Sequence, residues 1–456
     1  MKVRSLAEVA RLAKAQLVRG NRDVSICSAI FDSRVAREGS LFIALPGANC
    51  HGIEHAGQAV ENGSQAVLCE TGMSASHDGP SLEVPDVHAA LMQLAGAIRS
   101  EEAAEVPVLA VTGSVGKTTT CSMLAALLGQ TMAVHSPQSS YNNNIGVPIT
   151  ILEADPATEA LILELGTNAP GEIAELADIA RPRYGAVTAV SEAHLEGLGS
   201  LQGVLREKFS LLERIEGDGC WAPVEWRDHF EKCGGNGFRW TGPSGDLEIA
   251  PDGSGGVRVV DRIRSREFAL PWKPPAPWAS RCLESAVALA LELVEDPDQL
   301  VEAARTIRLP RWRHEVHSVE GIELVLDCYN SSPLALRNAI DDLGQSTSRR
   351  KLAVLGTMEE LGREEKRFHV EAGRQCVRSG IDVVFVAGRA SEWIDQGVKE
   401  AGAESIFISD GEQGARMVKE QLKAGDRVLF KASRKEQLEQ IAILVKQQLQ
   451  AEGAGS

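Results

Sequence analysis

The sequence predicts an α/β protein of three domains: a small α/β domain, a central domain with a parallel sheet and a phosphate-binding loop, and a C-terminal Rossmann-like domain. Through most of the 456-residue chain, short apolar segments alternate with helical patterns, as in parallel sheets covered on both faces. At roughly 100–200 residues per domain, two to four domains are expected. Changes of pattern place the domains at 1–84, 85–309 and 310–456.

The first domain has the pattern of a small α/β module. The apolar segments 40–45 and 65–70 are expected to be strands, because turn-forming stretches rich in Gly, Pro and Asn surround them. Residues 1–17 have the pattern of an amphipathic helix and lack the uninterrupted apolar stretch of a signal peptide. A linker helix over 88–105 is expected to lead into the second domain.

The central domain begins with the apolar strand 106–113, and a helix is expected over 117–131. Two more apolar strands are expected at 160–166 and 184–190, which gives the strand–helix alternation of a parallel sheet. Residues 241–270 alternate instead with period two, which predicts a small antiparallel addition.

The third domain repeats the strand–helix alternation and is expected to form a second nucleotide-binding type of layer. Its expected strands are IELVLDCYN (322–330), KLAVLGT (351–357), DVVFVAG (382–388) and RVLFKA (427–432).

Composition excludes several classes of function. The formal net charge of -16 argues against a nucleic-acid partner. The nine cysteines are scattered without a CxxC pair, as in a reduced protein without structural zinc. No run of about 18 apolar residues occurs, so no membrane partner is expected. These features predict a cytoplasmic protein.

The strongest motif is VTGSVGKTTT (111–120), which follows a strand and begins a helix. Its glycines let the backbone curl around phosphate oxygens, and the helix N-terminus adds a partial positive charge. Lys117 is expected to neutralise the β- and γ-phosphates and Thr118 to offer its hydroxyl to Mg²⁺. The expected phosphate-binding residues are Gly113, Ser114, Val115, Gly116, Lys117, Thr118 and Thr119. The loop alone does not distinguish hydrolases, kinases and ligases.

Two further side chains follow strands of the same sheet. Glu164 ends the strand 160–166 and is expected at the carboxyl edge, where a carboxylate suits Mg²⁺. His194 follows the strand 184–190 and is expected beside the metal or the acyl-phosphate oxygens. Lys208, taken by itself, is expected to be an ordinary solvent-exposed helical lysine.

Four segments and one lysine, taken in order, resemble the Mur ligase superfamily. That superfamily makes peptidoglycan precursors and includes folylpolyglutamate synthase as a relative. The four segments are GSVGKTTT (113–120), NNNIGVP (142–148), ELGTNAPGEI (164–173) and SEAHLEGLGS (191–200), and the lysine is the downstream Lys208. The resemblance covers nearly the whole chain and implies a UDP-binding, an ATPase and a Rossmann-like domain.

The C-terminal motifs resemble the members of the family that add D-alanyl-D-alanine to UDP-N-acetylmuramoyl-tripeptide. The segments DCYNSSP (327–333), LGTMEELG (355–362) with His369, and KASR (431–434) carry this likeness. It implies an ATP-dependent ligase that works through an acyl-phosphate intermediate, with ATP as substrate and Mg²⁺ as cofactor.

The resemblance also implies a role for each matching residue. Lys117, His194 and Lys208 take part in catalysis, and Thr118, Glu164 and His194 bind Mg²⁺. Lys208 matches a lysine that is carbamylated in several family members, where the new carboxylate helps to bind a second Mg²⁺. The nucleoside of ATP is expected to contact Arg313, Asp327, Tyr329 and Asn330, and the UDP-sugar-peptide Ser33, Arg34, Asn142 and Asn143. We expect the working protein to be a monomer.

Some positions depart from the family pattern. Glu284 or Ser285 falls where the family has an adenine-reading Asn, and Trp312 stands where a Gly precedes the family's Arg. Two alternatives therefore stay open. The chain could be another amino-acid-adding member, for diaminopimelate, lysine or folate polyglutamate, or a non-catalytic nucleotide-binding homologue.

Overall fold

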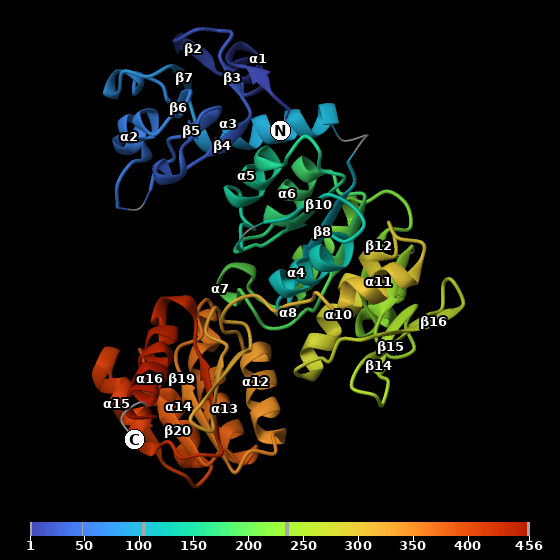
Figure 1. Cartoon of the computed structure of the whole chain (residues 1–456), viewed down its shortest axis with the longest axis vertical. Helices are drawn as coiled ribbons and strands as arrows, with labels where there is room; N and C mark the ends of the chain where they lie inside the picture. Colours follow the sequence, from blue (N-terminus) through green and yellow to red (C-terminus); the bar gives the residue numbers. More distant parts are fainter. Residues whose placement is uncertain (1, 48, 103–105, 138, 233–236, 454–456) are drawn as a thin grey trace.

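The computed structural model describes residues 2–47, 49–102, 106–137, 139–232 and 237–453. Figure 1 shows three parts arranged along the long axis, with the N-terminal part (blue) at one end and the C-terminal part (orange and red) at the other. Each part is built around its own sheet. Three α/β parts, as the sequence predicted, are thus present.

The N-terminal sheet has the strand order β2-β7-β6-β5-β4 and is parallel except for the β2–β7 pair. The helix expected over residues 1–17 is shorter, because Lys14 adopts a positive φ of 53° and the chain then enters a strand. The elements are β1 (Arg4–Ser5), α1 (Leu6–Leu12), β2 (Gln16–Arg19), β3 (Ser25–Ile26), β4 (Ser28–Ile30), η1 (Ser33–Val35), β5 (Ser40–Ile43), η2 (Gly52–His55), α2 (Ala56–Glu61), β6 (Ala66–Glu70), η3 (Ser74–Ser76) and β7 (Ser81–Val84).

The central sheet has nine strands in the order β16-β15-β14-β13-β12-β11-β8-β10-β9. Its strands β8 to β13 pair in parallel, and the period-two segment forms the antiparallel strands β14, β15 and β16 at one edge. The expected linker helix is α3, whose predicted last residues, 103–105, lie outside the described part of the chain.

The elements of the central part are α3 (Val87–Glu102), β8 (Val108–Thr112), α4 (Lys117–Leu128), β9 (Val134–His135), α5 (Gly146–Glu153), β10 (Ala160–Glu164), α6 (Glu172–Ala180), β11 (Tyr184–Val187), α7 (Leu195–Leu198), α8 (Leu201–Phe209), η4 (Leu212–Arg214), β12 (Cys220–Pro223), η5 (Val224–Trp226), α9 (Arg227–Lys232), β13 (Phe238–Thr241), β14 (Leu247–Pro251), β15 (Val257–Asp261), β16 (Arg266–Leu270), α10 (Pro277–Ala290) and α11 (Pro297–Ala304).

The C-terminal sheet has the order β17-β18-β22-β19-β20-β21, and only the β17–β18 pair is antiparallel. Its elements are β17 (Glu315–Val319), β18 (Ile322–Leu326), α12 (Pro333–Gln345), β19 (Arg350–Leu355), η6 (Gly362–Glu364), α13 (Glu365–Arg378), β20 (Val383–Val386), α14 (Ser391–Glu400), β21 (Ser405–Phe407), α15 (Gly411–Gln421), β22 (Asp426–Lys431), η7 (Arg434–Glu436) and α16 (Leu438–Gly453).

The buried apolar side chains join the first two parts and set the third apart. One continuous core contains Leu41 of β5, Leu91 of α3 and Val108 of β8, so it runs from the N-terminal sheet into the central one. The C-terminal sheet has separate cores on its two faces. Among the described residues, no helix is both long and apolar enough to cross a membrane.

Candidate functional site

The phosphate-binding loop connects the fully buried strand β8 to helix α4. Gly113 and Gly116 have φ angles of 151° and 87°, which favour glycine. A Cβ atom at Gly113 would lie only 2.1 Å from Thr188 Oγ1. Helix α4 has no side-chain cap, which leaves its first N–H groups available for an anion. The loop therefore has the backbone that the motif predicted.

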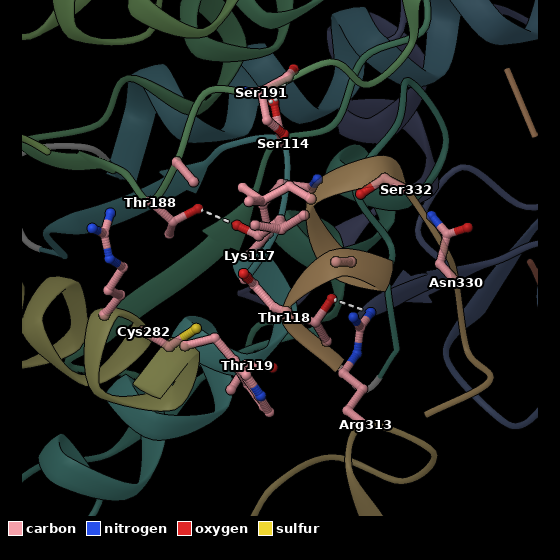
Figure 2. Close-up of a pocket in the computed structure, with 18 of the residues that line it drawn as sticks. Ser114, Lys117, Thr118, Thr119, Thr188, Ser191, Cys282, Arg313, Asn330 and Ser332 are labelled. Atoms are coloured by element: carbon pink, nitrogen blue, oxygen red, sulfur yellow. Dashed lines mark hydrogen bonds between the residues drawn. The ribbon is translucent and has the colours of Figure 1, made fainter. Parts of the chain in front are cut away.

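Side chains from four segments meet at Thr118, in the first turn of α4. The Thr118 hydroxyl donates to Glu164 Oε2 (2.7 Å) at the end of β10 and lies 3.0 Å from Ser140 Oγ. Arg313 Nη2, from the third domain, donates to Thr118 Oγ1 over 2.8 Å. Figure 2 shows Arg313 reaching Thr118 from a separate loop. The cluster joins the second and third domains.

A cavity of about 520 Å³ opens over the loop and extends to the third domain. Most of the residues predicted to bind ATP or its metal line it, and they come from segments more than 200 residues apart. Those lining it are Ser114, Val115, Gly116, Lys117, Thr118, Thr119, Glu164, Arg313, Asp327, Tyr329 and Asn330. Gly113, which was also predicted to bind phosphate, begins the loop and is not among the residues that line the cavity. The structure thus brings the two halves of the predicted nucleotide site together.

Lys117 provides a positive charge at the loop end of this cavity. Its Nζ donates to the Gly113 carbonyl over 2.7 Å. Burial lowers the pKa of Lys117, while the nearby carboxylate of Glu164 raises it. A triphosphate in the cavity would add negative charge and favour the protonated amine further.

The wall formed by the third domain is held by a buried lysine. Lys431 Nζ donates to Asp327 Oδ2 (2.8 Å) and to the carbonyl of Asn330 (3.1 Å). The guanidinium of Arg313 lies 4.4 Å from the ring centre of Tyr329. The four residues predicted to contact the nucleoside therefore lie together, held by these contacts.

Glu164 and Thr118 fit the ligand chemistry of Mg²⁺. Glu164 is 1% exposed, and both of its oxygens accept hydrogen bonds, from Thr118 and from Asn142 Nδ2 (2.7 Å). No group of three His, Cys, Asp or Glu side chains within the described ranges is arranged to hold a metal. Mg²⁺ commonly takes one or two carboxylates plus phosphate oxygens and water, so this pair suits it once a nucleotide supplies the phosphates.

His194 lies at the interface between the second and third domains. It precedes α7 with a φ of 54°, and its Nδ1 is 2.5 Å from Glu360 Oε2. Burial lowers the pKa of His194, although the hydrogen bond with Glu360 raises it. The imidazole is therefore near Lys117 but turned toward the third domain, and a metal at Glu164 would compete with Glu360 for it.

Lys208 is the largest departure from the solvent-exposed lysine that its residue pattern predicts. The side chain is 0% exposed on α8, and its Nζ has no hydrogen-bond partner among the described residues. Burial lowers the pKa of Lys208 well below its ordinary value, and the charge of Lys117 lowers it further. Burial favours the neutral form of an amine that has no hydrogen-bond partner.

Comparisons with known proteins identify the family to which the chain belongs. The chain is 31% identical over 440 residues to the UDP-N-acetylmuramoyl-tripeptide--D-alanyl-D-alanine ligase of Synechocystis. The alignment covers 94% of this chain and 94% of that enzyme. The chain is a Mur ligase. The models of the Mur ligase middle domain and of the Mur ligase glutamate ligase domain match residues 111–231 and 312–434.

Other relatives align with this Mur ligase over similarly long parts of both chains. The enzyme of the same name from Bacillus subtilis is 29% identical over 450 residues, covering 96% of this chain and 97% of its own. The MurF ligase of Thermotoga maritima in complex with ADP is 26% identical with a TM-score of 0.79, covering 93% and 98%. MurF from Acinetobacter baumannii, at 24% identity, shares the fold with a TM-score of 0.84 over 97% and 99%.

The residues predicted to bind the UDP-sugar-peptide are spread over two domains of the Mur ligase. The Ser33 hydroxyl donates to Gln58 Oε1 (2.7 Å), and Arg34 is exposed beside Asp32. Asn142 lines the nucleotide cavity, where its amide donates to Glu164. Asn143 Oδ1 accepts from Gly146 N (2.9 Å) at the start of α5. Their role in substrate binding stays a prediction.

Several side chains of the site were not predicted from the sequence. Ser140 contacts Thr118, Thr188 donates to the Val115 carbonyl (2.5 Å), and Glu360 pairs with His194. Ser140 and Thr188 reach helix α4 and the phosphate-binding loop only after folding, whereas Glu360 belongs to the LGTMEELG segment of the third domain and contacts His194. Lys431 begins the KASR segment, so the motif was a usable signal for that residue.

Glu284 and Ser285, which stand where the family has an adenine-reading Asn, lie on α10 away from the cavity. Neither lines the cavity; the residues of this helix that do are Trp278, Arg281 and Cys282. Glu284 Oε1 instead accepts from Ile249 N (3.1 Å) on β14. Helix α10 therefore faces the cavity with its first turns, whereas Glu284 anchors the strand β14.

Replacing Glu284 by glutamine is expected to stabilise this Mur ligase at neutral to alkaline pH. Burial raises the pKa of Glu284 to about 7, so between pH 4.5 and 7 the folded protein binds more protons than the unfolded chain. The free energy of unfolding of the wild type therefore falls as pH rises through this window. The Glu284→Gln variant keeps an oxygen that can accept from Ile249 N. Its free energy of unfolding at pH 8 should exceed that of the wild type by on the order of 2 kcal/mol.

Urea unfolding of both proteins at pH 5 and pH 8 measures this difference. The two proteins should be nearly equal at pH 5. Equal differences at both pH values would contradict the assignment.

Proposed function

We propose that this Mur ligase joins the terminal carboxylate of UDP-N-acetylmuramoyl-tripeptide to the amine of D-alanyl-D-alanine, using ATP, in peptidoglycan precursor synthesis. The main support is the cavity that the phosphate-binding loop shares with the third domain, where Arg313 reaches Thr118. Relatives with this substrate pair in their names align along almost the whole chain. We also propose that the reaction takes place in the cytoplasm, where ATP is supplied.

The proposed reaction has two steps. A carboxylate oxygen of the tripeptide bonds to the γ-phosphorus of ATP, and ADP leaves. The amine nitrogen of the dipeptide then bonds to the acyl carbon, phosphate leaves, and the amine proton passes to solvent. Because two anions approach each other in the first step, nearby cations contribute most to the rate. Lys117 and Arg313 are the cationic side chains at the loop end of the cavity.

Thr118 and Glu164 are the residues we propose to hold Mg²⁺, with His194 as a further ligand if it leaves Glu360. When bound, Mg²⁺ neutralises charge that develops on the phosphate oxygens. Asn142 holds the Glu164 carboxylate in place through its amide. We propose that Lys208 carries a carbamate near these residues, because its buried amine has no hydrogen-bond partner among the described residues and lies within electrostatic range of Lys117 and Glu164.

The third domain supplies the nucleoside contacts in this proposal. Asp327, Tyr329 and Asn330 form the wall opposite the loop, and Lys431 keeps that wall in place. Closure of this domain over ATP would exclude the water that hydrolyses an acyl phosphate. Ser33 and Arg34 are proposed to contact the uridine nucleotide. Since one chain supplies both walls of the cavity, we propose a monomer.

Product mass provides the test. The protein is incubated with ATP, Mg²⁺, UDP-N-acetylmuramoyl-tripeptide and either D-alanyl-D-alanine or a single amino acid, and the product is weighed. The proposal requires a product heavier than the tripeptide substrate by one dipeptide less one water, with ADP and phosphate in equal amounts. Extension only by diaminopimelate, lysine or glutamate would assign another ligase activity. Nucleotide binding without product would make the chain a non-catalytic homologue.

A further inference from the structure

The linker from the second domain enters the third domain over residues 310–314, and it contains an aromatic residue in a conformation that normally requires glycine. Trp312 has a φ of 58°, in the left-handed region that bulky side chains rarely adopt. Such a conformation persists only where the surroundings hold it. Trp312 is therefore held in place by its contacts, and the next residue is Arg313 of the nucleotide cavity.

Two guanidinium groups hold the indole ring. The guanidinium carbons of Arg311 and Arg434 lie 4.6 Å and 4.5 Å from its ring centre, within the range of cation–π attraction. Arg311 belongs to the linker. Arg434 is the last residue of the KASR segment and the first residue of η7 in the third domain. The ring also packs against the core of that domain. Trp312 thus fastens the linker to the third domain.

Backbone contacts of Trp312 extend this attachment. Its N–H donates to Glu315 Oε2 (3.0 Å), and its carbonyl accepts from Tyr329 N (3.3 Å). Tyr329 lines the cavity and lies under the Arg313 guanidinium at 4.4 Å. The positions of Trp312, Tyr329 and Arg313 are therefore linked by direct contacts.

We propose that Trp312 is a positioning residue for the ligase reaction: by clamping the linker to the third domain, it sets the Arg313 guanidinium on Thr118. This inference rests on the proposed function. Arg313 touches the residue that we propose to bind Mg²⁺, so a shift of the linker moves a cation away from the reacting phosphate. Misplacement by about 1 Å is enough to slow an enzyme severely.

A double-mutant cycle tests the proposal with Trp312→Gly, Arg313→Ala and the double variant. Glycine tolerates the positive φ, so this substitution removes the ring without adding backbone strain. Trp312→Gly should lower kcat about tenfold or more and leave the KM for the UDP-sugar-peptide unchanged. In the Arg313→Ala background the same substitution should change kcat by less than about twofold, because its effect passes through Arg313.

Two further variants keep the test independent of folding. Trp312→Phe retains an aromatic face for the guanidinium groups and should restore most of kcat. Arg311→Gln removes one of these groups from an exposed position, so the fold should survive, and it should lower kcat only when Arg313 is present. The same cycle measured on the affinity for a non-hydrolysable ATP analogue, by titration calorimetry, gives a readout without turnover.

Additive losses in the cycle would overturn the positioning role, as would normal kcat in Trp312→Gly. These outcomes are distinct from failure of the proposed function, in which the wild-type protein itself makes no dipeptide-extended product.

Discussion

Replacement of Lys117 by alanine is expected to lower kcat by a factor of about 10²–10³ or more. The amine lies in the first turn of α4 at the loop end of the cavity, where charge builds up as the γ-phosphoryl group is transferred. Arg313 approaches from the other domain and contacts Thr118 instead, so it does not replace the lost charge at the same place. ADP release with all three substrates measures the effect.

The control for this variant is Lys399→Ala. Lys399 is exposed on α14, pairs with Asp395 and does not line the cavity. Its loss should leave kcat within about twofold of the wild type, as expected for an exposed ion pair. A Lys117→Ala protein that keeps more than a tenth of the wild-type kcat would defeat the assignment of this lysine.

Replacement of Lys208 by methionine is expected to lower activity about 10–100-fold without destabilising the fold. Methionine fills a similar volume and removes a desolvated amine that has no hydrogen-bond partner among the described residues. The free energy of unfolding should therefore rise by on the order of 1 kcal/mol at neutral pH. A loss of stability together with the loss of activity would point to a structural role for the lysine.

The pH dependence of stability provides a second measurement on Lys208. The pKa of its amine is lowered by burial in the folded protein, so the unfolded chain binds the extra proton between that pKa and the ordinary one. In this window the free energy of unfolding should rise with pH in the wild type more steeply than in Lys208→Met.

The carbamate itself is detectable by NMR. Wild-type protein equilibrated with ¹³C-bicarbonate should show a carbamate carbon that Lys208→Met lacks. In buffer depleted of CO₂ the wild-type activity should fall, and bicarbonate should restore it. Full activity without CO₂ would show that the free amine suffices.

Local sequence patterns predicted the fold and much of the site. The phosphate-binding loop and Glu164 follow directly from buried strands, because a strand end fixes where the next side chain lies. The nucleoside residues were found through motif resemblance, and the structure places them on the same cavity as the loop. These features depend on short segments, which a sequence shows plainly.

Other features depend on contacts between distant segments. Lys208 has the pattern of an exposed helical lysine, but the packing of α8 buries it. The sequence did not show which side chains of α10 line the cavity, because helical periodicity does not reveal which face a distant domain covers. The contact of His194 with Glu360 joins two domains and left no local signal.

The single apolar core that runs from the N-terminal sheet into the central one has a mechanical consequence. Because they share this core, we expect the first two parts to move together as one body. The proposed uridine site and the phosphate-binding loop then lie on the same body, so their spacing is set during folding. Closure of the third part would change its contacts with the central part, among them Arg313 with Thr118 and Glu360 with His194.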